Sequence, residues 1–431
     1  MIKIVEANSN IGKEYMQYLK KRAEDVQKDV NIVVDKILGE VRTRGDDAII
    51  EYTQKFDSKF ITTKNLIVTA EEIKNAYKMV DKDFLEAITL SKNNVKEFHE
   101  KQKSNAWMMT KEKGVILGQT VRGLESAGIY VPGGTAAYPS TVIMNAIPAK
   151  VAGVKNLVMA TPPLADGSVN PHILVAADIS GVDKIYKMGG AQAIAGLAFG
   201  TETISKVDKI VGPGNIYVAM AKKSVFGDVD IDMIAGPSEI LIIADEIANE
   251  KFIAADLMSQ AEHDVLASAM LITTSREFAE KVVCELEIQI KDLNRCGIIK
   301  ESLEKYGVIL IVQNIKEAID LANKIAPEHL EIMLKNPFDF LGDIKNAGSI
   351  FLGQYSPEPL GDYIAGPNHV LPTSGTARFF SPLSVDDFIK KSSYLYYTKE
   401  ALQDVKDKII KLSEVEGLTA HGNSIKVRFK A

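Results

Sequence analysis

The chain has 431 residues, 46% of them hydrophobic and 25% charged, with a net charge of -6 and a pI of about 5.7, which is typical of a globular protein of several domains. An acidic balance gives no basic surface for nucleic acid or an anionic membrane, and we expect neither partner. The chain has only two cysteines, too few for a disulfide framework. It has neither the apolar core of a signal peptide nor an apolar run long enough to span a membrane, and we therefore expect a cytoplasmic protein.

The first quarter of the chain is predicted to be helical. Residues 1–25 read as a polar N-terminal arm with a short helix, and apolar residues then recur with helical spacing from 31 to 103. The second long helix of this region is expected from about 70 to 99. His99 lies among charged residues at its end, and we expect it to be a solvated surface residue.

The composition changes near residue 115. Between 120 and 199 only nine residues are charged, less than half the chain average, as expected for parallel strands covered by helices on both faces. Short apolar runs that end in Gly or Pro, each followed by a helical run, lie at 128–131, 157–160, 185–188 and 209–211. This strand-turn-helix repeat predicts a βαβ array.

The array resumes after residue 239. Strands are expected at 240–243, 269–272 and 308–311, with helices at about 276–293 and 315–325 between and after them. A further helix, from about 251 to 267, carries Gln260 and His263 on the side of Ile253 and Leu257. An apolar stripe that ends in an amide and an imidazole is either a satisfied polar core or a site.

The last eighty residues differ in pattern. Residues 353–383 form a loop rich in Gly, Pro and Ser that is long enough to suggest a function. An amphipathic helix with Leu402, Val405, Ile409 and Leu412 follows. Residues 425–429 alternate apolar and basic side chains, which predicts a terminal strand that pairs with a sheet.

Four scattered polar residues could form one metal site. Gln260, His263, Asp362 and His421 offer two nitrogens and two oxygens, which suits a borderline ion such as zinc, with manganese or cobalt as substitutes. An amide oxygen is a weak ligand, so such a site would be open to substrate atoms. No HExxH or CxxC motif is present, and spacing alone is a weak signal.

Glu328 and His329 form a candidate acid-base pair. They follow Pro327, which fits the first position of a helix. The positive end of a helix dipole would keep Glu328 ionised and His329 neutral, the state in which each can act as a base. The alternative is a capping carboxylate beside a partly exposed histidine.

A glycine turn at 212–215 lacks the third glycine of the dinucleotide fingerprint, although it could still present backbone N–H groups to a phosphate. For each such turn taken singly, a plain tight turn of an α/β protein is the favoured interpretation.

Taken together, the motifs resemble histidinol dehydrogenases along nearly the whole chain. The stretches that carry the resemblance are GIYVPGG at 128–134, GGAQAIA at 189–195, VGPGN at 211–215, AGPSE at 235–239, QAEHD at 260–264, APEHL at 326–330, GDY at 361–363, GPNHVLP at 366–372 and EGLTAH at 416–421.

The resemblance implies an α/β fold of two nested, incomplete Rossmann-like domains with parallel sheets. The implied division is a 1–25 arm, a discontinuous first domain of 26–128 and 240–381, a second domain of 129–239, and a 382–431 tail. The tails would be swapped in a homodimer, so that each completes the neighbour's site.

It also implies a zinc- and NAD-dependent oxidation of L-histidinol to L-histidine through the aldehyde, in histidine biosynthesis. One zinc ion per subunit would be held by Gln260, His263, Asp362 and His421, and Glu328 and His329 would be the catalytic acid-base pair. The implied substrate contacts are Ser238, Gln260, His263, His329, Asp362, Glu416 and His421. The implied NAD contacts are Tyr130, Gln192 and Asn215.

Two other functions are compatible with parts of the sequence. A zinc-dependent hydrolase in which Glu328 activates water would explain the metal ligands but not the βαβ array. A protein that binds a metal or nucleotide without turnover would keep the fold and lose the chemistry.

Overall fold

The computed structural model describes residues 2–21, 27–133 and 137–430. It divides into two compact units, a main unit of residues 1–102 and 124–388 and a tail unit of 103–123 and 389–431. Of the GIYVPGG stretch at 128–134, Gly134 lies outside the described residues.

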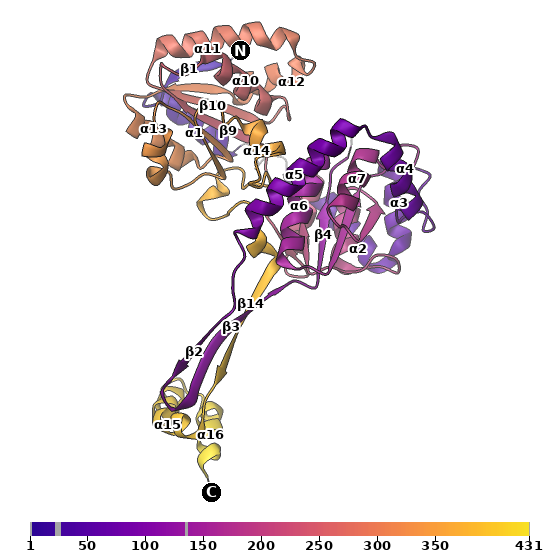
Figure 1. Ribbon diagram of the computed structural model, residues 1–431, viewed down its shortest axis with the longest axis vertical. Helices are drawn as coiled ribbons and strands as arrows, with labels where there is room; N and C mark the ends of the chain where they lie inside the picture. The colour runs from indigo at the N-terminus through magenta and orange to yellow at the C-terminus, as the bar shows by residue number, and fades with distance from the viewer. Residues whose placement is uncertain (1, 22–26, 134–136, 431) are drawn as a thin grey trace. The chain divides into compact units, whose positions relative to one another are not determined.

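Sheet A of the main unit is parallel throughout, in the strand order β1-β11-β10-β9-β12-β13. Figure 1 labels β1, β9 and β10 of this sheet. Its strands are β1 (Lys3–Glu6), β9 (Glu239–Ala244), β10 (Ser268–Thr273), β11 (Val308–Ile311), β12 (His329–Met333) and β13 (Ser349–Leu352). Its helices are α1 (Asn10–Lys21), α10 (Glu250–Ala261), α11 (Arg276–Gln289), α12 (Cys296–Tyr306), α13 (Ile315–Ile325) and α14 (Glu358–Tyr363), with short 3₁₀ segments at Ile290–Asp292 and Pro337–Asp343.

Alternation along β9 explains the layering of sheet A. Ile240 and Ile242 pack into a core with residues of α10, α11 and α12, whereas Leu241 and Ile243 pack into a second core with residues of α13. Both faces of the strand are therefore buried, and the strand reads as a continuous apolar run in the sequence.

Sheet B of the main unit is also parallel, in the order β6-β5-β4-β7-β8. Its strands are β4 (Ser126–Tyr130), β5 (Asn156–Thr161), β6 (Lys184–Lys187), β7 (Lys209–Val211) and β8 (Asp230–Ile231). Its helices are α2 (Gln27–Arg44), α3 (Asp46–Phe56), α4 (Ala70–Met79), α5 (Lys82–Glu100), α6 (Pro139–Ala152), α7 (Pro171–Ile179), α8 (Gly190–Phe199) and α9 (Ile216–Val225).

The predicted grouping of residues 26–128 with residues 240–381 is wrong, because the helices of the first segment pack on sheet B and not on sheet A. Helices α2 and α3 share a core with α8, α9 and one face of sheet B, and α4 and α5 share another with α6, α7 and the opposite face. Conversely, β1 of the predicted arm pairs with β11 and extends sheet A. Amphipathic helices do not reveal from their own pattern which apolar surface they cover.

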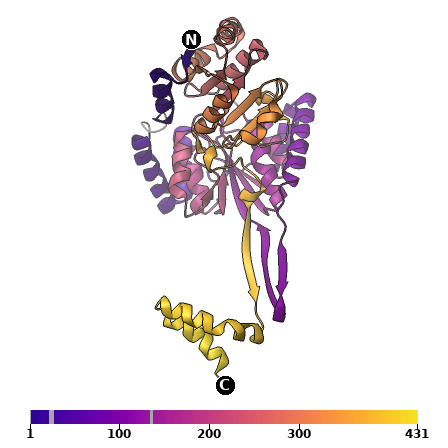
Figure 2. The same ribbon diagram turned by 90° about the vertical axis from the view of Figure 1, so that its left-hand side faces the viewer.

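The tail unit contains an antiparallel sheet in the order β14-β3-β2 and two helices (Figure 2). The strands are β2 (Trp107–Lys111), β3 (Val115–Gly123) and β14 (Ile389–Tyr396), and the helices are α15 (Lys399–Val415) and α16 (Thr419–Lys426). Short 3₁₀ segments lie at Glu112–Gly114 and Val427–Phe429 here, and at Thr376–Arg378 and Val385–Phe388 in the main unit.

The terminal strand predicted at 425–429 is wrong, because these residues end α16 and continue into a 3₁₀ turn. Lys406 of α15 lies over the ring of Phe429, 5.5 Å from its centroid. An alternation of five residues is too short to exclude a helix packed on its neighbour.

The helix predicted from 70 to 99 is two helices. Thr69 caps α4 in a reciprocal capping box with Glu72, and the Asp81 side chain caps α5 by accepting a hydrogen bond from the Phe84 N–H. None of the described helices is both long enough and apolar enough to cross a membrane.

Candidate active site

Glu328 and His329 lie at the amino end of β12, beside the amino end of β9, and not in a helix. The Glu239 N–H donates a hydrogen bond to Oε2 of Glu328 at 2.8 Å. The prediction that a helix dipole sets their charge states is therefore wrong. Both side chains are buried, with 6% and 4% of their surface exposed.

The two ring nitrogens of His329 have different surroundings. Nδ1 lies 3.0 Å from the carbonyl oxygen of Glu239. Since a carbonyl only accepts, Nδ1 carries the proton in this hydrogen bond. Nε2 has no hydrogen-bond partner among the residues that the structure describes, and lies 3.8 Å from Oδ1 of Asp362 and 4.0 Å from Oε1 of Glu358.

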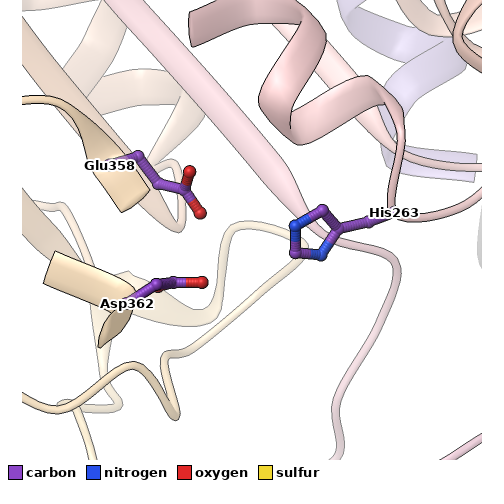
Figure 3. Close-up of side chains that lie close together, drawn as sticks. All are labelled: His263, Glu358 and Asp362. Carbon is purple, nitrogen blue, oxygen red and sulfur yellow. The ribbon is translucent and has the colours of Figure 1, made fainter. Parts of the chain in front are cut away.

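Helix α14, within the loop predicted to be functional, brings two carboxylates to this point. Glu358 and Asp362 are four residues apart and so share a face of the helix. They point toward His263, and one ligand atom from each of the three lies within 4.8 Å of the others (Figure 3). His263 and Asp362 are thus brought together as predicted, and Glu358 is an addition that the sequence reading missed.

Gln260 lies in the last turn of α10 and is fully buried, and both atoms of its amide lack a partner among the described side chains and backbone. The helix ends at Ala261, so the expectation that His263 continues its stripe one turn later is wrong. His263 follows Glu262, the C-cap residue of α10, and is exposed.

Burial and neighbouring charge alter the acidity of these groups. Burial raises the pKa of Glu328 to about 8, although His329 and the Glu239 N–H oppose the rise. Burial lowers the pKa of His329, but the carboxylates of Glu328, Asp362 and Glu358 outweigh it and raise that pKa to about 10. Burial also raises the pKa of Glu358, to about 8. The raised pKa values of the two carboxyl groups mean that burial disfavours their charged forms, and a cation bound beside them would stabilise those forms.

A cleft of about 240 Å³ opens beside these groups. His329 and Asp362 line it together with Phe351, Leu360 and His369. His369 Nδ1 donates to the backbone oxygen of Asp362 at 3.1 Å, which fixes the backbone that carries the carboxylate.

The remaining predicted substrate residues fall in two places. Ser238 immediately precedes β9, next to Glu239 and so on the same edge of sheet A as Glu328. Glu416 and His421 belong to the tail unit, at the end of α15 and in α16, and both are exposed there.

The three predicted NAD contacts lie along the carboxyl edge of sheet B. Tyr130 ends β4, Asn215 caps α9 after β7, and Gln192 lies in the first turn of α8 after β6. The chain begins sheet B at β4 and adds β5 and β6 on one side of it. It then adds β7 and β8 on the other side of β4, so a topological switch point lies between β4 and β7. Ligands of open α/β sheets bind at such points.

Two of these three side chains are engaged with other protein groups. The Tyr130 hydroxyl accepts a hydrogen bond from the Gly190 N–H at 3.1 Å, and the Gln192 amide donates to Asp57 at 3.4 Å. Both side chains are buried, whereas Asn215 is exposed. Burial raises the pKa of Asp57 to about 6, and an N–H bond from Gly189 opposes it.

His99 is not the solvated residue predicted from its charged neighbours. It is fully buried, its Nδ1 donates to the Val95 carbonyl at 2.8 Å, and the Asn368 amide lies 3.3 Å from Nε2. Burial lowers its pKa. His99 thereby ties α5 to the segment that carries His369.

Comparison with known proteins finds members of one family that match the chain over nearly its whole length. The family model described as histidinol dehydrogenase matches residues 20–429. The chain belongs to the histidinol dehydrogenase family. A histidinol dehydrogenase from Clostridium acetobutylicum is 63% identical over 430 residues, covering 100% of this chain and 99% of the relative. One from Caldanaerobacter subterraneus subsp. tengcongensis is 58% identical, with the same coverage.

A solved structure gives the same result for the fold. The crystal structure of histidinol dehydrogenase from Elizabethkingia anophelis has a TM-score of 0.93 and 39% identity, and the match covers 99% of this chain and 98% of that one. The chain is accordingly an enzyme, an oxidoreductase of the histidinol dehydrogenase family.

The residues around α14 fit a divalent cation. The buried amide of Gln260, Nε2 of His329 and Oε1 of Glu358 all lack partners among the described residues. Buried polar atoms are normally satisfied, and the unsatisfied atoms of His329 and Glu358, which lie 4.0 Å apart and beside Asp362, are characteristic of a site that binds a ligand.

Proposed function

We propose that the chain oxidises L-histidinol to L-histidine through the aldehyde, in two successive hydride transfers to NAD, with one zinc ion per subunit. The observation that carries this proposal is the position of His329, which lines the cleft with Glu328 beside it and Asp362 3.8 Å from its Nε2. Because Nδ1 donates to Glu239, Nε2 is the nitrogen that is free to take a proton whenever the ring is neutral.

The proposed zinc ligands are Gln260, His263, Asp362 and His421. The first three belong to the main unit, where Gln260 is buried with its amide unpaired. A zinc ion held by these residues would supply a Lewis acid that helps to orient the substrate. Ser238, His329, Glu416 and His421 are the further proposed contacts of the substrate.

His329 is the proposed base for the first oxidation. Its Nδ1–H bond to Glu239 holds the ring, so Nε2 is the nitrogen that takes the hydroxyl proton as the hydride leaves the carbinol carbon. Nε2 is 4.0 Å or less from two carboxylates, which stabilise the imidazolium that results.

Glu328 is the proposed base for the second oxidation. Its Oε2 is fixed by the Glu239 N–H and lies 3.8 Å from Nδ1 of His329. With His329 it removes a proton from water as the water adds to the aldehyde carbon, and the gem-diol then gives up the second hydride. Each base contributes about two to four powers of ten in rate.

NAD is proposed to bind at the carboxyl edge of sheet B, near Tyr130, Gln192 and Asn215. The switch point between β4 and β7 supports this position. The bonds of Tyr130 to Gly190 and of Gln192 to Asp57 hold the turn before α8 rigid, and Asn215 is the exposed member of the three.

We further propose a homodimer in which the tail unit of one chain brings Glu416 and His421 to the main unit of the other. Trp107, Met108, Leu395, Leu412 and Val415 of the tail unit are large apolar side chains that are at least half exposed. Apolar surface of this extent on so small a unit is typical of a protein interface. A cytoplasmic location also stays a prediction.

The test is a spectrophotometric assay with NAD and histidinol, followed by the same assay with the aldehyde. Absorbance at 340 nm is expected to rise with both substrates. The alternative, a zinc-dependent hydrolase that uses Glu328 to activate water, predicts no change in absorbance with either.

A further inference from the structure

Glu358 is held in the candidate active site by contacts that leave one carboxylate oxygen free. Its backbone N–H donates to Oε1 of Glu331 on β12 at 2.9 Å, and the Ser259 hydroxyl donates to its Oε2 at 3.3 Å. Pro357 and Pro359 flank it and restrict the backbone. Oε1 has no hydrogen-bond partner among the described residues, and the residue is only 2% exposed.

The free oxygen faces the groups that would surround a cation. It lies 4.0 Å from Nε2 of His329, and Glu358 shares with His263 and Asp362 a set of ligand atoms within 4.8 Å (Figure 3). A carboxylate with one oxygen fixed by the protein and the other directed at a metal is a common arrangement of ligands.

Charge balance favours the same role. A divalent ion held by neutral His263, the Gln260 amide and one carboxylate would keep a net charge of about +1 in a mostly buried site, which is costly. A second carboxylate neutralises it. Conversely, Glu358 without a cation is a buried group with an unsatisfied oxygen.

We propose that Glu358 coordinates the divalent cation directly, so that Gln260, His263, Glu358 and Asp362 form a cation site within one main unit. This rests on the proposed zinc dependence and adds a ligand to it. His421 from the tail would then complete a site that already binds the ion, and would not be required to capture it.

The experiment measures binding of Co²⁺ and Zn²⁺ to the metal-free full-length protein, without NAD or substrate. Glu358→Gln keeps the shape and removes the charge, and it is expected to weaken Co²⁺ binding about 100-fold and to change the visible spectrum of bound Co²⁺. Glu262→Gln is the matched control, since it removes a half-buried carboxylate adjacent to His263 that is not among the clustered ligand atoms, and it is expected to change affinity less than about threefold.

A second variant separates coordination from charge compensation. Glu358→Asp keeps the charge but shortens the side chain, so direct coordination predicts that it too binds at least about tenfold more weakly. Wild-type affinity in Glu358→Asp, or in Glu358→Gln, overturns the proposal. Thermal unfolding of the metal-free variants reports whether α14 is intact, and a loss of affinity counts only when that unfolding matches wild type.

The two proposals fail in different ways. If the wild-type protein oxidises histidinol without a bound metal, the zinc dependence is wrong. If the wild-type protein binds one ion and is active, and Glu358→Gln binds the ion equally well, only the role of Glu358 is wrong.

Discussion

At the scale of single residues, the backbone around β9 and β12 determines which atoms can react. The Glu239 carbonyl holds the proton on Nδ1 of His329, and the Glu239 N–H holds the carboxylate of Glu328. One residue on the neighbouring strand therefore orients both proposed bases. A division of labour between the bases follows, because only His329 has a free nitrogen on the side of Asp362.

Glu328→Gln is expected to separate the two oxidations. The amide keeps an oxygen for the Glu239 N–H, so the alcohol-to-aldehyde step should retain most of its rate. Oxidation of the aldehyde should fall by about two to four powers of ten, because no base activates the water. Single-turnover kinetics from histidinol and from the aldehyde measure the two steps, and equal loss of both contradicts the division.

The residue types of the site were only partly evident from the sequence. His263, Asp362, Glu328 and His329 stand in short motifs, and the structure brings their main-unit side chains together. Glu358 was missed because a glutamate between two prolines looks like a loop residue. His99 was misjudged because its charged neighbours lie on other faces of α5, and their charge hides the one buried face.

At the scale of elements, the turn after β7 depends on a buried ion pair. Lys222 of α9 donates to the Gly212 carbonyl at 2.9 Å, Asp232 accepts from the Gly212 N–H at 2.8 Å, and Lys222 and Asp232 pair with each other. Gly212 has a φ of 115°, and a Cβ there would overlap the Tyr130 carbonyl oxygen. Only glycine fits this turn.

Gly212→Ala should destabilise the chain by about 3 kcal/mol or more, because positive-φ strain and steric overlap add. The measurement is the shift of the urea unfolding curve. Gly153→Ala is the control, since Gly153 has a φ of 89° with no heavy atom within 4 Å of the position that a Cβ would take, and should cost only about 1 kcal/mol. Equal costs for the two variants contradict the role of the Tyr130 contact.

Asp57 gives an element-scale prediction about pH. Its pKa in the folded chain is raised from 3.8 to about 6, so between these values the folded state binds more protons than the unfolded one. This group's contribution therefore falls as pH rises from about 4 to 6, and it opposes folding above that range.

Asp57→Asn keeps an oxygen for the Gly189 N–H and has no charge to bury. It should raise the melting temperature at pH 8 by more than it does at pH 4. Differential scanning calorimetry at the two pH values checks this. The same shift at both pH values contradicts the burial effect.

The strands and helices of the βαβ array were predicted from their pattern, because strands buried on both faces read as short apolar runs between glycine turns. Strands β2 and β14 were not, since they are exposed and carry no continuous apolar run. The packing of α2 to α5 on sheet B was not predicted either, because the sequence of these helices shows that they have an apolar face but not which sheet that face covers.

At the scale of the whole molecule, the proposed site needs residues from both units. The main unit supplies Gln260, His263 and Asp362, and the tail unit carries Glu416 and His421. Short motifs indicated that these residues act together, but no local pattern tells whether the tail serves its own chain or a neighbour. That question concerns assembly and is answered by mixing subunits.

Gln260→Ala and His421→Ala should each be inactive alone and should regain activity when mixed. If tails are exchanged, a heterodimer has one site with both defects and one intact site, so random exchange restores about a quarter of wild-type activity. Differently tagged subunits verify that heterodimers form. Verified heterodimers without activity argue for sites built within one subunit.

The number of NADH molecules formed per histidinol consumed tests the central claim most directly. The proposed sequence of two oxidations in one site predicts two, without release of the aldehyde, and none after removal of zinc by a chelator until zinc is restored. A value of one, or turnover that is unaffected by the chelator, contradicts the account.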